Sequence, residues 1–215
     1  ASVQWLDYAL QLEPENREAL QLKLEIYSGF GDWPQVTQIL GLQFQYASTA
    51  EEKIDVLLRR AALYRDTLGQ SQEAIDDFVE VLNQDPHHAQ AYEELTKLLN
   101  QLQAWDQLYD VMGFRATIIP EDEKKQMYLD MSEVAKKLGD SERRIDSLEK
   151  AYNLDPSDLD VVSPLLDATI AAGEFDRAEP MLEQVINTLT EKRRMKEVVQ
   201  FYHLRGKLAE QRGNQ

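Results

Sequence analysis

The chain has 215 residues, a formal net charge of −16 and no cysteine. The lack of cysteine excludes a disulfide framework and thiolate chemistry. A surface this acidic repels phosphate, so nucleic-acid binding is not expected. No apolar run approaches the roughly 18 residues of a membrane span, so membrane insertion is not expected either.

Apolar residues recur at three- and four-residue steps, which predicts helices along the chain. The first helix is expected over 2–13, the second over 15–30 and the third from 33 to about 47. Thr49 followed by Glu52 predicts a capping box, in which the two residues satisfy free backbone donors at the start of the next helix.

Bends between paired helices recur at intervals of 34 to 40 residues. Three of the bends are followed after 17 residues by a proline, at Pro86, Pro120 and Pro156. The first helix of the second repeat fits the spacing of the others only if the turn 65–70 is one residue longer. The sequence therefore predicts an internal repeat with bends at Gly31, Gly69, Gln103, Gly139, Gly173 and Gly213.

Two helices and a tight bend in about 34 residues resemble the tetratricopeptide repeat. That family favours an aromatic residue two positions after the bend, where Trp33, Trp105 and Phe175 stand. The resemblance implies an all-α fold, a right-handed superhelical α-solenoid of antiparallel helix pairs, and a fragment of a longer bacterial-type array without its true N-terminus. The expected divisions of this single solenoid are a half repeat over 1–14, full repeats over 15–48, 49–86, 87–120, 121–156 and 157–190, and a half repeat over 191–215.

The histidines offer no metal site, because His87 and His88 are neighbours and His203 has no ligand partner at metal spacing. We expect exposed turn residues at 87 and 88. No catalytic residue, metal or cofactor is predicted, because the abundant carboxylates fit solvated helix faces and no phosphate-binding loop is present. The basic run 192–196 is interpreted as a solvated helix entrance, and Trp5, Trp33 and Trp105 as core residues.

The resemblance implies that the first helix of each repeat lines an inner, concave wall. Its exposed positions lie at fixed distances before each bend and share one helix face. Ile170 is also expected there, as the last such position of the fifth repeat. The partner-binding candidates are Glu18, Gln21, Glu25, Gln90, Glu93, Lys97, Asn100, Gln126, Leu129, Glu133, Lys136, Asp160, Ser163 and Asp167.

The sequence therefore predicts a non-enzymatic protein–protein interaction scaffold that binds a peptide or protein on this wall. Two alternatives stay open, namely the recognition arm of an enzyme whose catalytic domain lies elsewhere and a structural spacer in an assembly. The acidic surface suits a basic partner, or only keeps the chain soluble. End-to-end self-association through the two ends is a further expectation. A cytoplasmic location is expected, with the periplasm left open.

Overall fold

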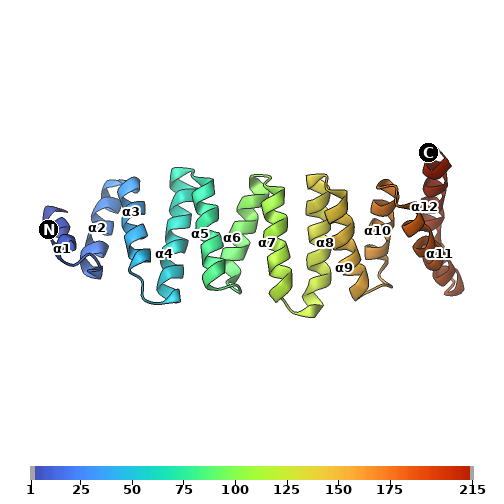
Figure 1. Cartoon of the computed structure of the whole chain (residues 1–215), viewed down its shortest axis with the longest axis horizontal. Coiled ribbons are helices and arrows are strands. Elements are labelled where there is room, and N and C mark those ends of the chain that lie inside the picture. Colours follow the sequence, from blue (N-terminus) through green and yellow to red (C-terminus); the bar gives the residue numbers. More distant parts are fainter. Residues whose placement is uncertain (1–2, 214–215) are drawn as a thin grey trace. The chain divides into compact units, whose positions relative to one another are not determined.

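A computed structural model describes residues 3–213, in which every regular element is a helix (Figure 1). The prediction of an all-α fold is confirmed. The α-helices are α1 (Val3–Leu12), α2 (Arg17–Phe30), α3 (Trp33–Gln45), α4 (Ala50–Leu63), α5 (Ser71–Gln84), α6 (Ala89–Gln101), α7 (Trp105–Ile118), α8 (Glu121–Leu138), α9 (Ser141–Leu154), α10 (Leu159–Ala171), α11 (Phe175–Glu191) and α12 (Met195–Gly213), and η1 (Tyr64–Leu68) is a π-helical turn.

The helices form two compact units, one up to Ala104 and the other from Trp105 onward. In each unit, helices that follow one another in sequence pack together, such as α4 with α5 and α8 with α9. The division falls between the two helices of the expected third repeat. The repeat borders given above stay a prediction, since helix bounds alone do not define which pairs fold as units.

Five of the predicted bends adopt the left-handed backbone conformation that ends a helix sharply. Four of them are glycines, with φ between 64° and 78°, and the fifth is Gln103, with φ of 56°. A further bend with this conformation lies at Arg193, between α11 and α12. Gly213 is the last residue of α12, and residues 214–215 of the sixth predicted bend lie outside the described part of the chain.

The longer turn predicted at 65–70 is confirmed, and its form is π-helical. Helix α4 continues into η1, and Gly69 then turns the chain with φ of 64°. The Gly69 amide donates to the Tyr64 carbonyl five residues before it, which is one residue more than in an α-helical turn. The Gln70 amide donates to the same carbonyl at 2.9 Å. A single π-helical turn accommodates one extra residue in a helix.

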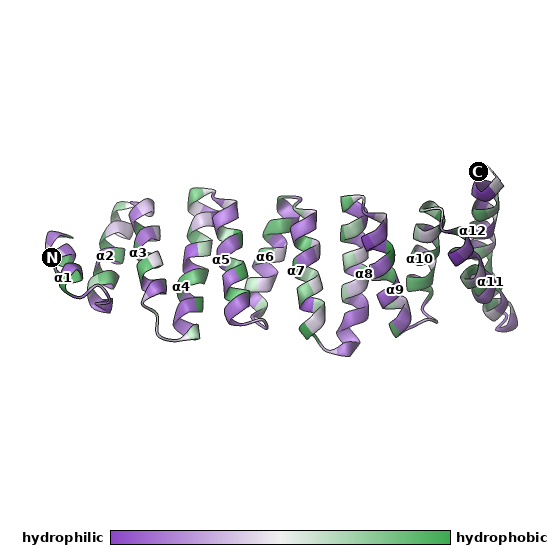
Figure 2. Cartoon of the chain, viewed as in Figure 1, coloured by the Kyte–Doolittle hydropathy of each residue, from purple (hydrophilic) through white to green (hydrophobic). Residues whose placement is uncertain are grey.

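Each helix carries both hydrophobic and hydrophilic positions, as expected of helices that bury one face (Figure 2). In the first unit Leu20, Ile39 and Leu40 lie at the centre of one core cluster. In the second unit a cluster around Leu182 and Phe201 joins α10, α11 and α12. The hydrophobic effect of burying these stripes is what holds neighbouring helices together.

The interpretation of the tryptophans as core residues is wrong for Trp5. Its side chain is 71% exposed, whereas Trp33 and Trp105 are half-buried. On α1 the buried side chain is Leu6, which points about 100° away from Trp5 on the helix. Helix α1 contacts α2 on that side, so the opposite face stays uncovered.

Candidate partner-binding surface

The first helix of each predicted pair is α2, α4 or α6 in the first unit, and α8, α10 or α12 in the second. Most of the predicted wall residues are exposed to solvent. Twelve of the candidates are exposed, and Leu129 and Ser163 are half-buried. The expectation for Ile170 is wrong, since it is 3% exposed and belongs to the α10–α12 core.

In the first unit a groove lies between α2 and α4 and holds a hollow of about 270 Å³. Leu20 and Val56 supply apolar walls, and Tyr46 closes one end from the segment after α3. Gln21 is the predicted wall residue that lines this hollow. Glu18 and Glu25 lie three and four residues away from it on the same helix face.

Arg17 joins α2 to the start of α4 at one side of this groove. Its guanidinium bonds both carboxylate oxygens of Glu52, at 2.5 and 2.9 Å. The Glu52 carboxylate also accepts the Ser48 amide at 2.7 Å. These bonds, from Arg17 first and then Ser48, hold the pKa of Glu52 below its ordinary value. The pair therefore links the start of α4 to α2 at one side of the groove.

The capping box predicted at the start of α4 is confirmed. Thr49 accepts the Glu52 amide at 3.1 Å, as expected of an N-cap. The Glu52 carboxylate in turn accepts a backbone hydrogen bond from Thr49, which is one of the causes of its lowered pKa. The same carboxylate also accepts the Ser48 amide at 2.7 Å and is held by Arg17 from α2.

On the other side of the same groove, polar side chains connect α4 to α3 and α2. Arg59 donates to Gln43 at 3.0 Å, and Gln43 donates to Gln21 at 3.5 Å. Gln21 also donates to Glu25 at 3.0 Å. The groove therefore presents ordered amides and carboxylates beside an apolar floor, which suits hydrogen bonding to an extended backbone.

The candidates on α6 and α8 lie on solvated faces, except for the half-buried Leu129. Lys97 lies 3.4 Å from Glu94 and 3.9 Å from Glu93, and these side chains form a local ion network on α6. On α8, Lys136 pairs with Glu133 at 3.3 Å, and Leu129 packs against a core cluster that includes Leu148. Exposed pairs like these contribute little to stability, so they remain available to a partner.

In the second unit, two adjoining hollows of about 430 and 500 Å³ lie between α10 and α12. Asp160 lines the smaller hollow, and Ser163 and Asp167 line the larger one. The α12 side of the larger hollow includes Lys196, Val199, Gln200, His203, Leu204 and Lys207. Lys207 approaches Asp167 to 3.6 Å across this groove.

The sequence did not identify the α4 and α12 sides of these grooves. The extra residue near Gly69 left the register of α4 undecided, and no wall positions were assigned to the last helix, although a bend was predicted at Gly213. Counting in steps of three and four along α12 from Lys196 would have indicated Val199, His203 and Lys207 as one face.

His88 has a role that the sequence did not reveal. It is half-buried, and its Nδ1 accepts the Ala91 amide at 3.1 Å, so it caps the start of α6. His87 is exposed, as predicted. The prediction that residue 88 is an exposed turn residue is therefore wrong, because His88 is a half-buried helix cap.

The grooves contain ion-paired carboxylates and amides. The carboxyl groups whose pKa departs from its ordinary value, such as Glu52, Asp66 and Asp155, all have lowered pKa values because cations or hydrogen-bond donors contact them. Lowered values keep these groups charged at neutral pH. Within residues 3–213 no three His, Asp or Glu side chains are grouped to hold a metal ion. Across that same range, no helix combines the length and the apolar character needed to cross a membrane.

Residues 125–158 match the family model described as the tetratricopeptide repeat. This segment covers most of α8 and all of α9, so the predicted resemblance is confirmed at this pair. A comparison with curated proteins found no match.

Three solved structures illustrate the similarity to known folds. MamA from Desulfovibrio magneticus RS-1 is 17% identical, with 79% of this chain and 93% of that chain covered and a TM-score of 0.40. A tetratricopeptide repeat protein from Parabacteroides merdae is 20% identical, with 96% and 77% covered and a TM-score of 0.40. The yeast Sti1 TPR2AB domain in complex with pHSP90 is 15% identical, with 96% and 90% covered and a TM-score of 0.42.

Proposed function

We propose that this tetratricopeptide repeat protein is a non-enzymatic scaffold that binds an extended segment of a partner protein along its first helices. The observation that supports this proposal is the coincidence of predicted wall positions with hollows. Gln21 lines the α2–α4 groove, and Ser163 and Asp167 line the α10–α12 groove. Open grooves with apolar floors and polar rims are typical of peptide-binding surfaces.

The α2–α4 groove favours a basic partner segment. Its two arginines are already occupied, since Arg17 pairs with Glu52 and Arg59 lies 3.5 Å from Asp55. Glu18 and Glu25 add further negative charge on the face of Gln21. Complementary charge steers a basic segment to this groove and raises its association rate.

The test uses the ¹⁵N-labelled chain and two decapeptides, (Lys-Ser)₅ and (Glu-Ser)₅, followed by amide chemical shifts. The basic peptide should shift amides of α2 and α4, and the acidic peptide should leave them unchanged. Shifts confined to the second helices, or shifts with neither peptide, would contradict the proposal.

A double variant then tests the groove itself. Replacing Glu18 and Glu25 by Ala, on the face of Gln21, should leave the helical circular dichroism unchanged and weaken binding of the basic peptide. The matched control replaces two exposed glutamates on second helices, Glu73 and Glu142, and should bind as the unmodified chain does. Equal binding by the two double variants would contradict the assignment of the groove.

A further inference from the structure

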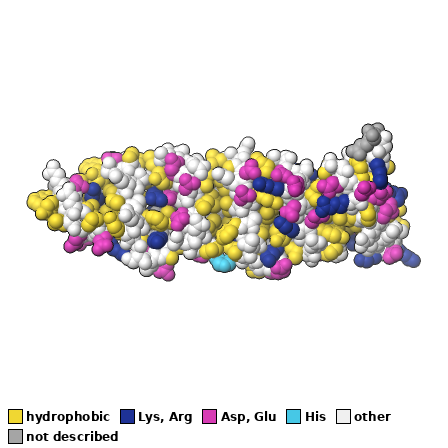
Figure 3. Space-filling model, viewed as in Figure 1, with side chains coloured by type: hydrophobic (Ala, Val, Ile, Leu, Met, Phe, Trp, Pro, Cys, Tyr) yellow, Lys and Arg dark blue, Asp and Glu magenta, His cyan; other side chains and the backbone are white. Residues whose placement is uncertain are grey.

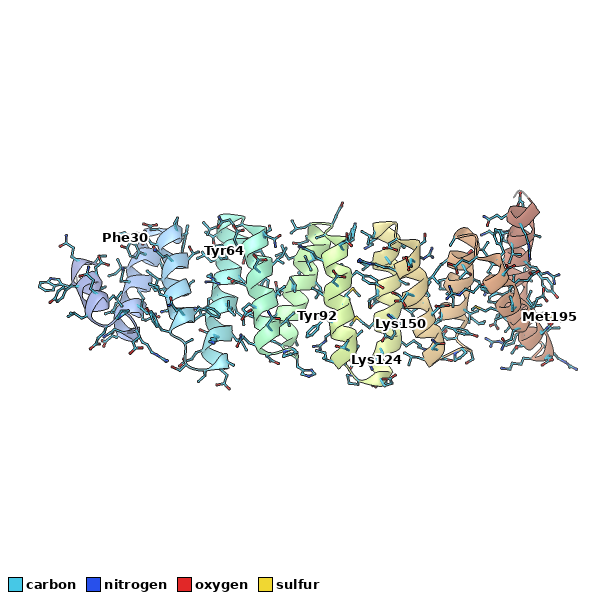
Figure 4. All side chains as sticks on the ribbon, viewed as in Figure 1. Phe30, Tyr64, Tyr92, Lys124, Lys150 and Met195 are labelled. Atoms are coloured by element: carbon cyan, nitrogen blue, oxygen red, sulfur yellow. The ribbon has the colours of Figure 1, made fainter. Side chains whose placement is uncertain are left out.

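The second unit contains a further hollow, of about 290 Å³, which none of the wall candidates lines. It is enclosed by the end of α9, the start of α10, the last turns of α11 and the turn that leads into α12. Met195, the first residue of α12, marks the place of this turn (Figure 4). The hollow borders the smaller hollow of the α10–α12 groove, with which it shares Ser157, Leu159 and Arg194.

The floor of this hollow is apolar. Val162 and Leu189 lie beneath it and are only 0 and 3% exposed, as members of the core cluster that joins α10, α11 and α12. Tyr152, Leu159 and Val185 pack against the same cluster and are half-buried, so they line the hollow with apolar surface. A ligand that places an apolar group here would remove this surface from water, which favours binding.

The charged side chains that line this hollow are both basic. They are Lys192 and Arg194, and no acidic side chain of the described residues is part of the lining. The three hollows described above each include at least one carboxylate, as expected in a chain with a net charge of −16. A basic rim therefore distinguishes this hollow from the grooves of the wall.

Lys192 is the lining cation that remains available to a ligand. Arg194 is occupied by Glu197, since its Nε lies 2.8 Å from one oxygen of that carboxylate. Lys192 and Arg193 are exposed and form no ion pair within residues 3–213. Lys and Arg side chains are visible at this end of α11, at the lower right of the view (Figure 3).

The acidic residues near the hollow do not cancel this charge in its lining. Asp155 and Asp158, in the segment between α9 and α10, are held by Lys125 from α8 at 3.3 and 2.7 Å. Asp160 lines the bordering hollow but not this one, and Glu191 lines neither. An anionic group at the rim therefore meets a free lysine without a competing carboxylate in the lining.

We propose that this hollow binds an acidic segment of a partner protein, with one large apolar side chain of the segment in the hollow and its neighbouring carboxylates at Lys192. A volume of about 290 Å³ is at the lower limit of the roughly 300–1,000 Å³ of small-molecule sites, so it fits one anchoring side chain better than a complete ligand. Charge complementarity selects an acidic segment over a basic one. This site lies apart from the wall and takes a partner of the opposite charge, so the proposal goes beyond the proposed function and does not depend on it.

The test follows amide chemical shifts of the ¹⁵N-labelled chain during titration with three peptides. The first is Ser-Glu-Ser-Glu-Leu-Glu-Ser-Glu-Ser, the second has alanine in place of leucine, and the third has lysine in place of every glutamate. The leucine peptide should shift the amides of Val185, Thr188 and Leu189 with a Kd on the order of 100 μM. The alanine peptide should bind at least about tenfold more weakly, because it leaves the hollow unfilled, and the lysine peptide should leave these amides unchanged. Equal binding of the leucine and alanine peptides, or no shift at these amides, would overturn the proposal.

Two neighbouring residues of α11 provide a matched pair of variants. Thr188 lines the hollow and Asn187 does not, and both are exposed, so helical circular dichroism should be preserved in either variant. Thr188→Glu places a carboxylate in the lining and should weaken binding of the leucine peptide at least about tenfold. Asn187→Glu adds the same charge outside the lining and should change binding by no more than about twofold. Equal weakening in the two variants would mean that the peptide responds only to net charge, and the site would be wrong.

Lys192→Gln tests the cation at the rim and should weaken binding of the leucine peptide by about threefold. Its control is Lys136→Gln, which removes an exposed lysine of the wall and should leave binding unchanged. A loss in Lys136→Gln alone would place the acidic peptide on the wall and overturn the proposal. Decanoate, an apolar chain with one carboxylate, tests a small amphiphile as the ligand. Shifts at the same amides with decanoate and with none of the peptides would also overturn the proposal, whereas binding of the leucine peptide supports it whether or not decanoate binds as well.

Discussion

Arg60 of α4 and Asp77 of α5 form a two-pronged ion pair between neighbouring helices. The Nε–Oδ2 distance is 2.8 Å and the Nη2–Oδ1 distance is 2.5 Å. Asp77 is only 4% exposed, and the Arg60 guanidinium also lies 5.8 Å from the centre of the Phe44 ring. The hydrogen bonds that Arg60 donates to Asp77 raise the pKa of Arg60, which opposes the loss of charge that burial favours.

Removing one member of this pair should leave an uncompensated buried charge. We expect Asp77→Ala to lower the free energy of unfolding by about 3–5 kcal/mol, measured by urea denaturation. Replacing both members with apolar residues, as Arg60→Met with Asp77→Leu, should restore most of that loss. The control is Asp76→Ala. The Asp76 side chain is exposed, so this variant should change the free energy of unfolding by no more than about 0.5 kcal/mol. Equal losses from Asp76→Ala and Asp77→Ala would contradict the role of the pair.

The cap on α6 gives a second prediction. His88→Ala removes the Nδ1 acceptor for the Ala91 amide and should lower the free energy of unfolding by about 0.5–2 kcal/mol. His88→Asn supplies a better capping side chain and should be at least as stable as the unmodified chain. His87→Ala is the matched control, because this neighbouring side chain is exposed. Thermal denaturation at pH 8 compares the three, and a loss as large for His87→Ala would show that the cap is not the cause.

A third prediction concerns the pH dependence of the contact that Glu52 makes with Arg17 and Ser48. Because the pKa of Glu52 is lowered in the folded chain, its charged form stabilises the contact with Arg17 and Ser48. This contribution is present above the ordinary pKa of a glutamate and is lost as the pH falls through the lowered pKa of the folded state. The Ser48 amide signal should therefore move as the pH is lowered into the acidic range. Glu52→Gln should lack this transition, and a Ser48 signal that titrates in that variant would assign it to another group.

Much of the helix order could be predicted from local signals. Glycine and proline mark helix ends through their own backbone restrictions, so Gly31, Gly139 and Gly173 located bends without knowledge of any neighbour. The mismatch of the helix before Gly69 with the spacing of the other repeats also indicated the extra residue there. A glycine or proline that marks a helix end can be recognised from the local sequence alone, without knowledge of the tertiary structure.

Burial could not be predicted as well, because it depends on which helices pack together. Ile170 occupies the same position before its bend as Asn100, which is exposed. In the second unit α12 packs beside α10 and covers Ile170. The prediction that Trp5 is a core residue is wrong for the opposite reason. No element within the described residues covers its side of α1.

A register prediction can be tested at Ala151, which is fully buried on α9. Ala151→Trp should overpack this position and lower the free energy of unfolding by about 1–3 kcal/mol. Asn153→Trp introduces the same side chain at an exposed position of the same helix and should be nearly neutral. Chemical denaturation of the two variants separates overpacking from a general effect of tryptophan, and equal stability would place Ala151 outside the core.

Arg144 provides the last prediction, because its Nε is buried and has no hydrogen-bond acceptor. It stands five residues after the bend at Gly139, on α9. An unsatisfied buried donor costs about 1–3 kcal/mol, so Arg144→Met, which keeps the aliphatic stem, should raise the free energy of unfolding by about 1 kcal/mol. The adjacent Arg143 donates to Asp106 at 2.8 Å and lies 5.0 Å from the centre of the Tyr109 ring, so Arg143→Met should instead lower stability. Opposite signs for these neighbouring variants in urea denaturation would support the assignment, and a comparable loss in both would mean that the Arg144 guanidinium is satisfied in solution.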